Sequence, residues 1–339
     1  MLLSAMALAT SVVGAGLYEA VPLSSSPVGI DYRAYHTEDR FGRRILFFVD
    51  TVADSRVKLP IAAFILGSGS YSRFQPRDGK LLSADAAFLR NLAGRARLVL
   101  VEKPGVRFGE HLPVRDLAEF RREHTLPRWV EAISAALKAA RALPGVDGER
   151  LLVVGHSEGA QVAASVAAAN DFVTHVACLG GASASTLFLE LRERRKQEHR
   201  LREYWRQWKE IMKYPDDAER LHHGHSYRYW TSFSASSALE ELPKANARVF
   251  LAQGSADGFD PAGDLDVVLA TLASKGKDVT SALAMGADHA FAYAREPRRD
   301  GWSQIQRRVL AWFFGGSGCE GAEGQRPEYC QSLMEISTK

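Results

Sequence analysis

The chain has 339 residues, of which 46% are hydrophobic and 24% charged, a globular composition that excludes collagen-like, coiled-coil and wholly disordered architectures. With 43 Lys and Arg residues against 40 Asp and Glu residues, the formal net charge is only +3, so charge gives no support for nucleic-acid binding. No apolar run long enough to span a bilayer occurs beyond the N-terminus, so no integral membrane span is expected there.

The N-terminal residues 1–29 are expected to form a segment of their own. Residues 2–17 are small or apolar and carry no charge, and their length suits the hydrophobic region of a signal peptide. The favoured interpretation is an export signal, which would place the protein in the periplasm or outside the cell. A cytoplasmic protein with an N-terminal extension is the alternative.

Strand-like and helix-like stretches alternate along residues 30–316. Short continuous apolar runs, typical of strands covered on both faces, occupy residues 45–52, 61–68, 97–105, 150–157, 174–183, 247–255 and 279–287. Amphipathic stretches predict helices over residues 126–143, 261–276 and 301–316. This alternation predicts an α/β fold with a mostly parallel sheet and helices on both faces.

Residues 184–245 interrupt the alternation because they contain no convincing strand. Between Leu201 and Met212 the apolar residues recur at helical spacing, which predicts an amphipathic helix. We therefore expect a helical cap inserted into the α/β body. Its aromatic residues either line an apolar pocket or pack the cap against the body; they are Phe188, Tyr204, Trp205 and Trp208.

The most informative motif is the sequence GHSEG at residues 155–159. It follows the apolar run LLVV and precedes a stretch of small residues that favours a helix. This strand–turn–helix context is typical of a nucleophile elbow, in which flanking glycines permit a tight turn that exposes the serine hydroxyl. We therefore predict Ser157 as a catalytic nucleophile.

A serine nucleophile needs a base and an acid that orients the base. Asp257 follows the predicted strand 247–255, and His289 follows 279–287, so both would lie beyond the carboxyl ends of parallel strands. We predict His289 as the base and Asp257 as its partner, with Asp260 as the alternative acid. Asp288 is expected to orient the loop of the base.

Other histidines offer alternatives to this assignment. His156 lies inside the elbow and is expected to support the turn rather than to act as the base. The HHGH sequence at residues 222–225 offers a weak metal-site hypothesis, because no carboxylate or cysteine stands at a suitable spacing, and a solvated cap loop is the simpler interpretation.

An acyl-transfer site also needs hydrogen-bond donors for an oxyanion. One donor is expected from the backbone N–H of Glu158, the residue after the nucleophile. The second is expected from the glycine-containing loop at residues 66–70, where we assign Ser68, with Gly69 as its rival.

The C-terminal residues 317–339 form a polar, glycine-containing tail that holds two of the three cysteines. A disulfide between Cys319 and Cys330 would close this tail and would imply an oxidising compartment, while two unpaired thiols are the alternative. Cys178 lies in an apolar run and is expected to be buried.

Taken together, these motifs resemble the α/β-hydrolase superfamily over roughly residues 30–316. The resemblance implies an eight-stranded, mostly parallel sheet flanked by helices, with the cap between the sixth and seventh strands. With its glutamate, the GHSEG motif is similar to that of the dienelactone-hydrolase and prolyl-oligopeptidase-like branches and of some acyl-CoA thioesterases. The resemblance to the superfamily rests on GHSEG, on GSAD at 254–257, on GADHAF at 286–291, on LGSGS at 66–70 and on VEKPGV at 101–106. Leu66 departs from the pattern, because many esterases carry a histidine at this position.

The expected function is hydrolysis of a small-molecule carboxylic ester through an acyl-enzyme on Ser157, with no metal or organic cofactor. A peptidase or thioesterase of the same fold is the alternative, and a non-catalytic binding protein of this fold is a further one. Nothing in the sequence indicates an oligomeric state.

Overall fold

The computed structural model describes residues 18–24, 31–51, 57–77, 80–83, 85–109, 117–194, 197–259, 262–315 and 330–332. Residues 1–17, Asp260 and Cys319 lie outside these ranges, and so do the apolar stretch of the proposed signal segment, residues 2–17, and one half of the proposed disulfide. Cys178 is a buried free thiol, as expected from its apolar surroundings.

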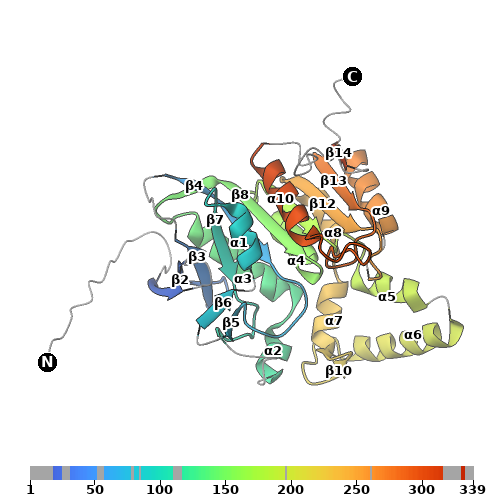
Figure 1. Cartoon of the computed structure of the whole chain (residues 1–339). Helices are drawn as coiled ribbons and strands as arrows, with labels where there is room; N and C mark the ends of the chain where they lie inside the picture. Colours follow the sequence, from blue (N-terminus) through green and yellow to red (C-terminus); the bar gives the residue numbers. More distant parts are fainter. Residues whose placement is uncertain are drawn as a thin grey trace.

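The core of the molecule is a single ten-stranded sheet (Figure 1). Five neighbouring pairs from β7 to β13 are parallel, and the pairs at both ends of the sheet are antiparallel. The spatial order is β1 (Tyr18–Ser24), β2 (Asp31–Glu38), β3 (Arg44–Asp50), β7 (Arg97–Val101), β4 (Leu59–Ile65), β8 (Val146–His156), β9 (His175–Leu179), β12 (Arg248–Gly254), β13 (Val279–Ala284) and β14 (Cys330–Ser332).

All seven strands expected from apolar runs are present, and with β2 they make up the expected eight-stranded, mostly parallel sheet. The strands β1 and β14 extend its two edges. β2 has no continuous apolar run, because exposed Arg33 and Glu38 alternate with buried residues such as Tyr32 and Ala34. A strand near the edge of a sheet can be half polar, and this is why the apolar runs did not reveal it.

Helices cover both faces of the sheet. Alternate residues of β8 face opposite sides: Leu151 and Val153 belong to one apolar cluster, while Leu152 and Val154 belong to the other. The first cluster contains residues of α3 (Leu126–Ala140), α4 (Glu158–Ala169) and α9 (Ala262–Ser274), and the second contains residues of α1 (Ala86–Leu92) and α10 (Gly301–Phe313). In the described part of the chain, no helix is long and apolar enough to cross a bilayer.

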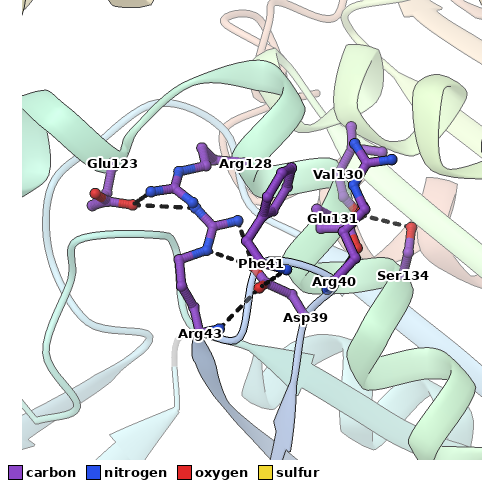
Figure 2. A network of polar contacts seen from close by, with 9 residues as sticks. All are labelled: Asp39, Arg40, Phe41, Arg43, Glu123, Arg128, Val130, Glu131 and Ser134. Carbon is purple, nitrogen blue, oxygen red and sulfur yellow. Dashed lines mark hydrogen bonds and ion pairs between the residues drawn. The ribbon is translucent and has the colours of Figure 1, made fainter.

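The turn between β2 and β3 is fastened to the helical layer by ion pairs (Figure 2). The Asp39 carboxylate accepts a hydrogen bond from Arg43 Nε at 2.6 Å, and Arg43 also approaches Glu123 of α2 (Leu117–Glu123) at 3.5 Å. Arg128 of α3 binds the same Glu123 carboxylate at 2.7 Å. These ion pairs connect the antiparallel strands β2 and β3 with helices α2 and α3.

Between β9 and β12 the chain forms the helical insertion, whose outer helices lie together at one side of the molecule (Figure 1). Helix α6 covers the stretch expected to be an amphipathic helix. The insertion also contains one short hairpin, so it is not wholly helical. Its elements are α5 (Thr186–Arg194), α6 (Glu198–Lys213), β10 (Leu221–His222), β11 (His225–Ser226), α7 (Tyr227–Ser234), α8 (Ala238–Glu241) and the 3₁₀ turn η1 (Leu242–Lys244).

Candidate active site

Ser157 lies at a sharp turn between β8 and α4. Its backbone angles are φ 57° and ψ −126°, a conformation that non-glycine residues rarely adopt. The neighbouring glycines are required by close packing: a Cβ on Gly155 would lie 1.9 Å from the Gly159 carbonyl oxygen, and one on Gly181 would lie 2.3 Å from the Ser157 carbonyl oxygen. This is the strained elbow that the motif predicts.

The structure brings Ser157, His289 and Asp257 into one hydrogen-bonded chain. Ser157 Oγ lies 2.8 Å from His289 Nε2, and His289 Nδ1 lies 2.7 Å from Asp257 Oδ2. Because a carboxylate only accepts, Nδ1 carries the proton and Nε2 is free to accept the hydroxyl proton. Asp257 is itself buried and held by Gln253 Nε2 at 2.6 Å and by the Phe259 N–H at 2.8 Å.

The loop that carries His289 is held from both sides. His156 Nε2 donates to the His289 carbonyl oxygen at 2.9 Å, so this elbow histidine supports the turn, as expected. Asp288 Oδ1 accepts from the N–H groups of Ala290 and Ala292 at 2.9 and 2.8 Å, so it orients the loop.

The histidines of the HHGH segment pack against aromatic side chains. No group of three metal-ligating side chains occurs within the described ranges. His225 instead stacks on Tyr229 with ring centroids 4.0 Å apart, and His222 packs against Trp230 at 5.4 Å. Burial lowers the pKa of His222 to about 4, so this histidine stays neutral at physiological pH.

A cavity of about 250 Å³ opens next to the nucleophile. Its walls come from the elbow, the cap and the loops after β4, β9, β12 and β13. The lining residues are Ser68, Ser157, Glu158, Gln161, Gly180, Gly181, Ser183, Ala184, Leu189, Ala238, Phe259 and His289.

None of the four cap aromatics singled out from the sequence lines this cavity. Tyr204 is buried within the insertion, where its ring contacts His222 and Arg194, and Trp208 packs against the apolar cluster that contains residues of α3, α4 and α9. Phe188 and Trp205 are largely exposed. The two largest apolar side chains that line the cavity are Leu189 of α5 and Phe259, whose ring lies beside His289.

Both segments assigned as oxyanion donors line the cavity. Ser68 and Glu158 flank Ser157, and a Cβ on Gly67 would lie only 2.9 Å from Ser157 Cβ. Gly159 allows the start of α4 to touch the end of β4, because its Cβ would lie 2.4 Å from the Ile65 carbonyl oxygen. The two backbone segments therefore meet at the nucleophile.

A buried polar cluster beneath the elbow was not expected from the sequence. The Glu158 carboxylate, which is 7% exposed, accepts hydrogen bonds from Lys103 Nζ at 3.3 Å, His124 Nε2 at 3.1 Å and Tyr229 OH at 2.6 Å. Lys103 also donates to the Gly67 carbonyl oxygen at 2.8 Å. These residues come from four distant parts of the chain, so no local pattern could have grouped them.

The charges in this cluster follow from burial and pairing. Burial raises the pKa of Glu158, but Lys103 and the hydrogen bonds from His124 and Tyr229 outweigh it and hold the pKa well below its ordinary value. Burial lowers the pKa of Lys103 against the attraction of Glu158, and lowers that of His124 to about 4. The cluster is thus a carboxylate–ammonium pair with a neutral histidine and tyrosine around it.

Comparison with known proteins places this site in a family. Residues 127–316, more than half of the chain, match the model of the prolyl oligopeptidase family. The chain belongs to the prolyl oligopeptidase family. The match contains Ser157, Asp257 and His289, and it makes the protein a serine hydrolase of the α/β-hydrolase fold. The comparison with curated proteins finds no match.

Solved structures share the fold at low sequence identity. A puromycin-hydrolyzing peptidase from Mycobacterium tuberculosis superposes with a TM-score of 0.60 at 18% identity, over 88% of this chain and 42% of that one. An acylaminoacyl peptidase from Pyrococcus horikoshii gives 0.55 at 14%, over 87% and 43%. A candidate dienelactone hydrolase from Klebsiella pneumoniae gives 0.50 at 17%, over 84% and 99%. The chain therefore spans less than half the length of these two peptidases.

Proposed function

We propose that this serine hydrolase cleaves carboxylic esters with a small or medium acyl group through an acyl-enzyme on Ser157. The observation that carries the proposal is the hydrogen-bonded chain from Ser157 Oγ through His289 to Asp257, which opens into a small cavity. In this arrangement a serine hydroxyl has a base within reach, and the base has a buried carboxylate to hold its tautomer.

The proposed reaction has two halves. Ser157 Oγ attacks the ester carbonyl carbon while its proton moves to His289 Nε2, and Asp257 stabilises the imidazolium that forms. The backbone N–H groups of Glu158 and Ser68 hold the oxyanion, and the leaving alcohol takes the proton from His289. Water then attacks the acyl-enzyme with His289 again as base, which releases the carboxylic acid and restores Ser157.

The cavity favours an uncharged acyl group. Of the described residues that line it, only Glu158 and His289 are ionisable, and the Glu158 carboxylate is already engaged by three partners. A cavity of about 250 Å³ lies just below the range of pockets that enclose drug-sized ligands, about 300–1,000 Å³. Both properties fit a short, neutral acyl chain better than an extended charged peptide.

A peptidase activity is the second candidate, and the family match favours it. Two of the superposed structures are named as peptidases, and residues 127–316 match a family named for an oligopeptidase. The same triad would serve both reactions, because ester and amide hydrolysis pass through similar tetrahedral intermediates. Leaving-group chemistry therefore has to be tested directly.

The test compares p-nitrophenyl esters from acetyl to palmitoyl with aminoacyl p-nitroanilides. We expect hydrolysis of the short esters, and the Ser157→Ala variant should lose at least about 10,000-fold in kcat/KM. Ser165→Ala is the matched control, because it removes a serine hydroxyl that has no partner among the described residues, from the same helix, α4. Cleavage of anilides in preference to esters would favour the peptidase, and Ser157-independent turnover would refute the proposal.

A further inference from the structure

Lys103 touches both backbone segments that meet at the nucleophile. It follows β7 in the chain, is 8% exposed, and lies with Nζ 4.3 Å from the centroid of the Trp129 ring. Nζ donates to the Gly67 carbonyl oxygen at 2.8 Å and to the Glu158 carboxylate at 3.3 Å. One buried ammonium group thus connects the loop after β4 with the first residue of α4.

The Gly67 carbonyl belongs to the same peptide group as the Ser68 N–H. A peptide group is planar and rigid, so a hydrogen bond that holds its carbonyl also holds the direction of its N–H. Accepting from a cation also polarises the group, which makes the opposite N–H a stronger donor. The Lys103 contact therefore acts on the atom assigned as the second oxyanion donor.

The other oxyanion donor is the backbone N–H of Glu158, whose side chain the same lysine holds. The Glu158 carboxylate is clamped further by His124 at 3.1 Å and by Tyr229 at 2.6 Å. With its side chain fixed on three sides, the first residue of α4 has little freedom to rotate away from Ser157. The Lys103 ammonium group therefore contacts the Gly67–Ser68 peptide group and Glu158, which carry the two oxyanion donors.

We propose that Lys103 is a positioning residue that aligns the two oxyanion donors of the elbow, the Ser68 and Glu158 N–H groups, relative to Ser157. This inference rests on the proposed acyl-transfer function. It assigns Lys103 no contact with the substrate: the described residues that line the cavity do not include it. Its effect should appear in the rate of the chemical step and not in the binding of the substrate ground state.

Lys103→Met keeps much of the side-chain length and removes the ammonium group. A fluorophosphonate probe reports on the variant without knowledge of the substrate. Ser157 Oγ forms a bond to phosphorus while its proton passes to His289 Nε2, fluoride leaves, and the phosphoryl oxygen occupies the oxyanion site. We expect labelling to slow about 10- to 100-fold, somewhat less than the about 100- to 1,000-fold that follows loss of a donor itself. The kcat for a p-nitrophenyl ester should fall by the same factor as the labelling rate, with KM within about twofold of the wild-type value.

The matched control is Lys277→Met. Lys277 Nζ also donates to a backbone carbonyl, that of Ala245, at 2.7 Å, but away from the elbow. The loss of the Lys277 ammonium group should leave the labelling rate unchanged.

Since Lys103→Met leaves the buried Glu158 carboxylate without its cation, the variant could unfold. The double variant Lys103→Met/Glu158→Gln removes both charges and keeps the question open to test, with circular dichroism to verify the fold.

The outcomes separate the two proposals. Slow labelling with unchanged KM in folded Lys103→Met supports the positioning role, and the double variant replaces it in the comparison only if Lys103→Met does not fold. Labelling at the wild-type rate in either folded variant overturns it and leaves the proposed function intact. If the wild-type protein neither reacts with the probe nor hydrolyses any ester or anilide, the proposed function fails, and the positioning role fails with it.

Discussion

The backbone at Gly67 lies so close to the nucleophile that a side chain has no space there. A Cβ at this position would lie 2.9 Å from Ser157 Cβ and 3.2 Å from the His156 carbonyl oxygen. For Gly67→Ala we expect the loop to shift away from Ser157, with about 1–3 kcal/mol lost in unfolding free energy and at least about 10-fold in kcat/KM. Urea unfolding and ester kinetics measure the two effects separately.

The control for this substitution is Gly263→Ala. Nothing lies within 4 Å of a Cβ built on Gly263, which is in the first turn of α9. The substitution should leave the kinetics unchanged and stabilise the helix by up to about 1 kcal/mol. If Gly67→Ala behaved in the same way, the close approach between the loop and the elbow would be wrong.

At this scale the sequence identified residues that carry a local signature and missed those that meet only in the fold. Ser157 lies in a five-residue motif, and Asp257 and His289 follow apolar strands, so all three could be predicted as site residues. Lys103, His124 and Tyr229 lie far apart in the chain and converge on Glu158 through tertiary packing. A buried contact of that range leaves no periodicity or spacing to detect.

Helix α7 is the element that joins the insertion to the elbow. Its Tyr229 hydroxyl donates to Glu158 Oε2 at 2.6 Å, and Phe233, one turn later, is buried in the main apolar cluster. A hydrogen bond to a charged acceptor contributes about 1.5–3 kcal/mol. We expect Tyr229→Phe to lower the unfolding free energy by about that amount, measured by urea denaturation at pH 7.5.

Tyr227→Phe is the matched control, because Tyr227 lies in the same helix and no hydrogen bond of its hydroxyl occurs among the described residues. We expect it to change the unfolding free energy by less than about 0.5 kcal/mol. Because both substitutions keep the aromatic ring, equal effects would mean that the Tyr229–Glu158 hydrogen bond does not contribute to the unfolding free energy.

Elements with strong periodicity could be predicted, and those held by their neighbours could not. The parallel strands read as apolar runs because both of their faces are covered, and α3, α6 and α10 carry apolar stripes. The two-stranded sheet of β5 (Phe74–Arg77) and β6 (Lys80–Ser83) and the hairpin of β10 and β11 are too short for such a pattern. The place of Phe259 at the cavity depends on the loop after β12, which has no repeat.

For the molecule as a whole, buried ionisable groups determine how stability varies with pH. Burial lowers the pKa of His175 to about 4, so the folded state loses stability as the pH falls from about 6.5 toward that value. Two carboxyl groups act in the opposite direction: burial raises the pKa of Asp50 to about 6 and that of Glu102 to about 7.

The effect of a buried carboxyl group on the pH dependence of stability can be tested at Asp50, where substitution by Asn replaces one carboxyl oxygen with an amide nitrogen. Asp50 ends β3, is 5% exposed, and accepts a hydrogen bond from the Leu98 N–H of β7. Its folded pKa of about 6 exceeds its ordinary value of 3.8, so the folded state binds the proton more tightly and stability is lost as the pH rises from 3.8 through 6. Asp50→Asn keeps an oxygen for Leu98 but cannot ionise.

The variant should therefore be the more stable protein at alkaline pH. We expect Asp50→Asn to exceed the wild type in unfolding free energy by up to about 3 kcal/mol at pH 8, and the difference to shrink below about 1 kcal/mol at pH 4, where Asp50 is neutral in the folded state. Urea unfolding at a series of pH values measures the difference, and the pH 4 point serves as the internal control for packing. A difference that is constant with pH would show that the Asp50 carboxyl does not carry the buried charge, since only a titrating group can make the two curves diverge.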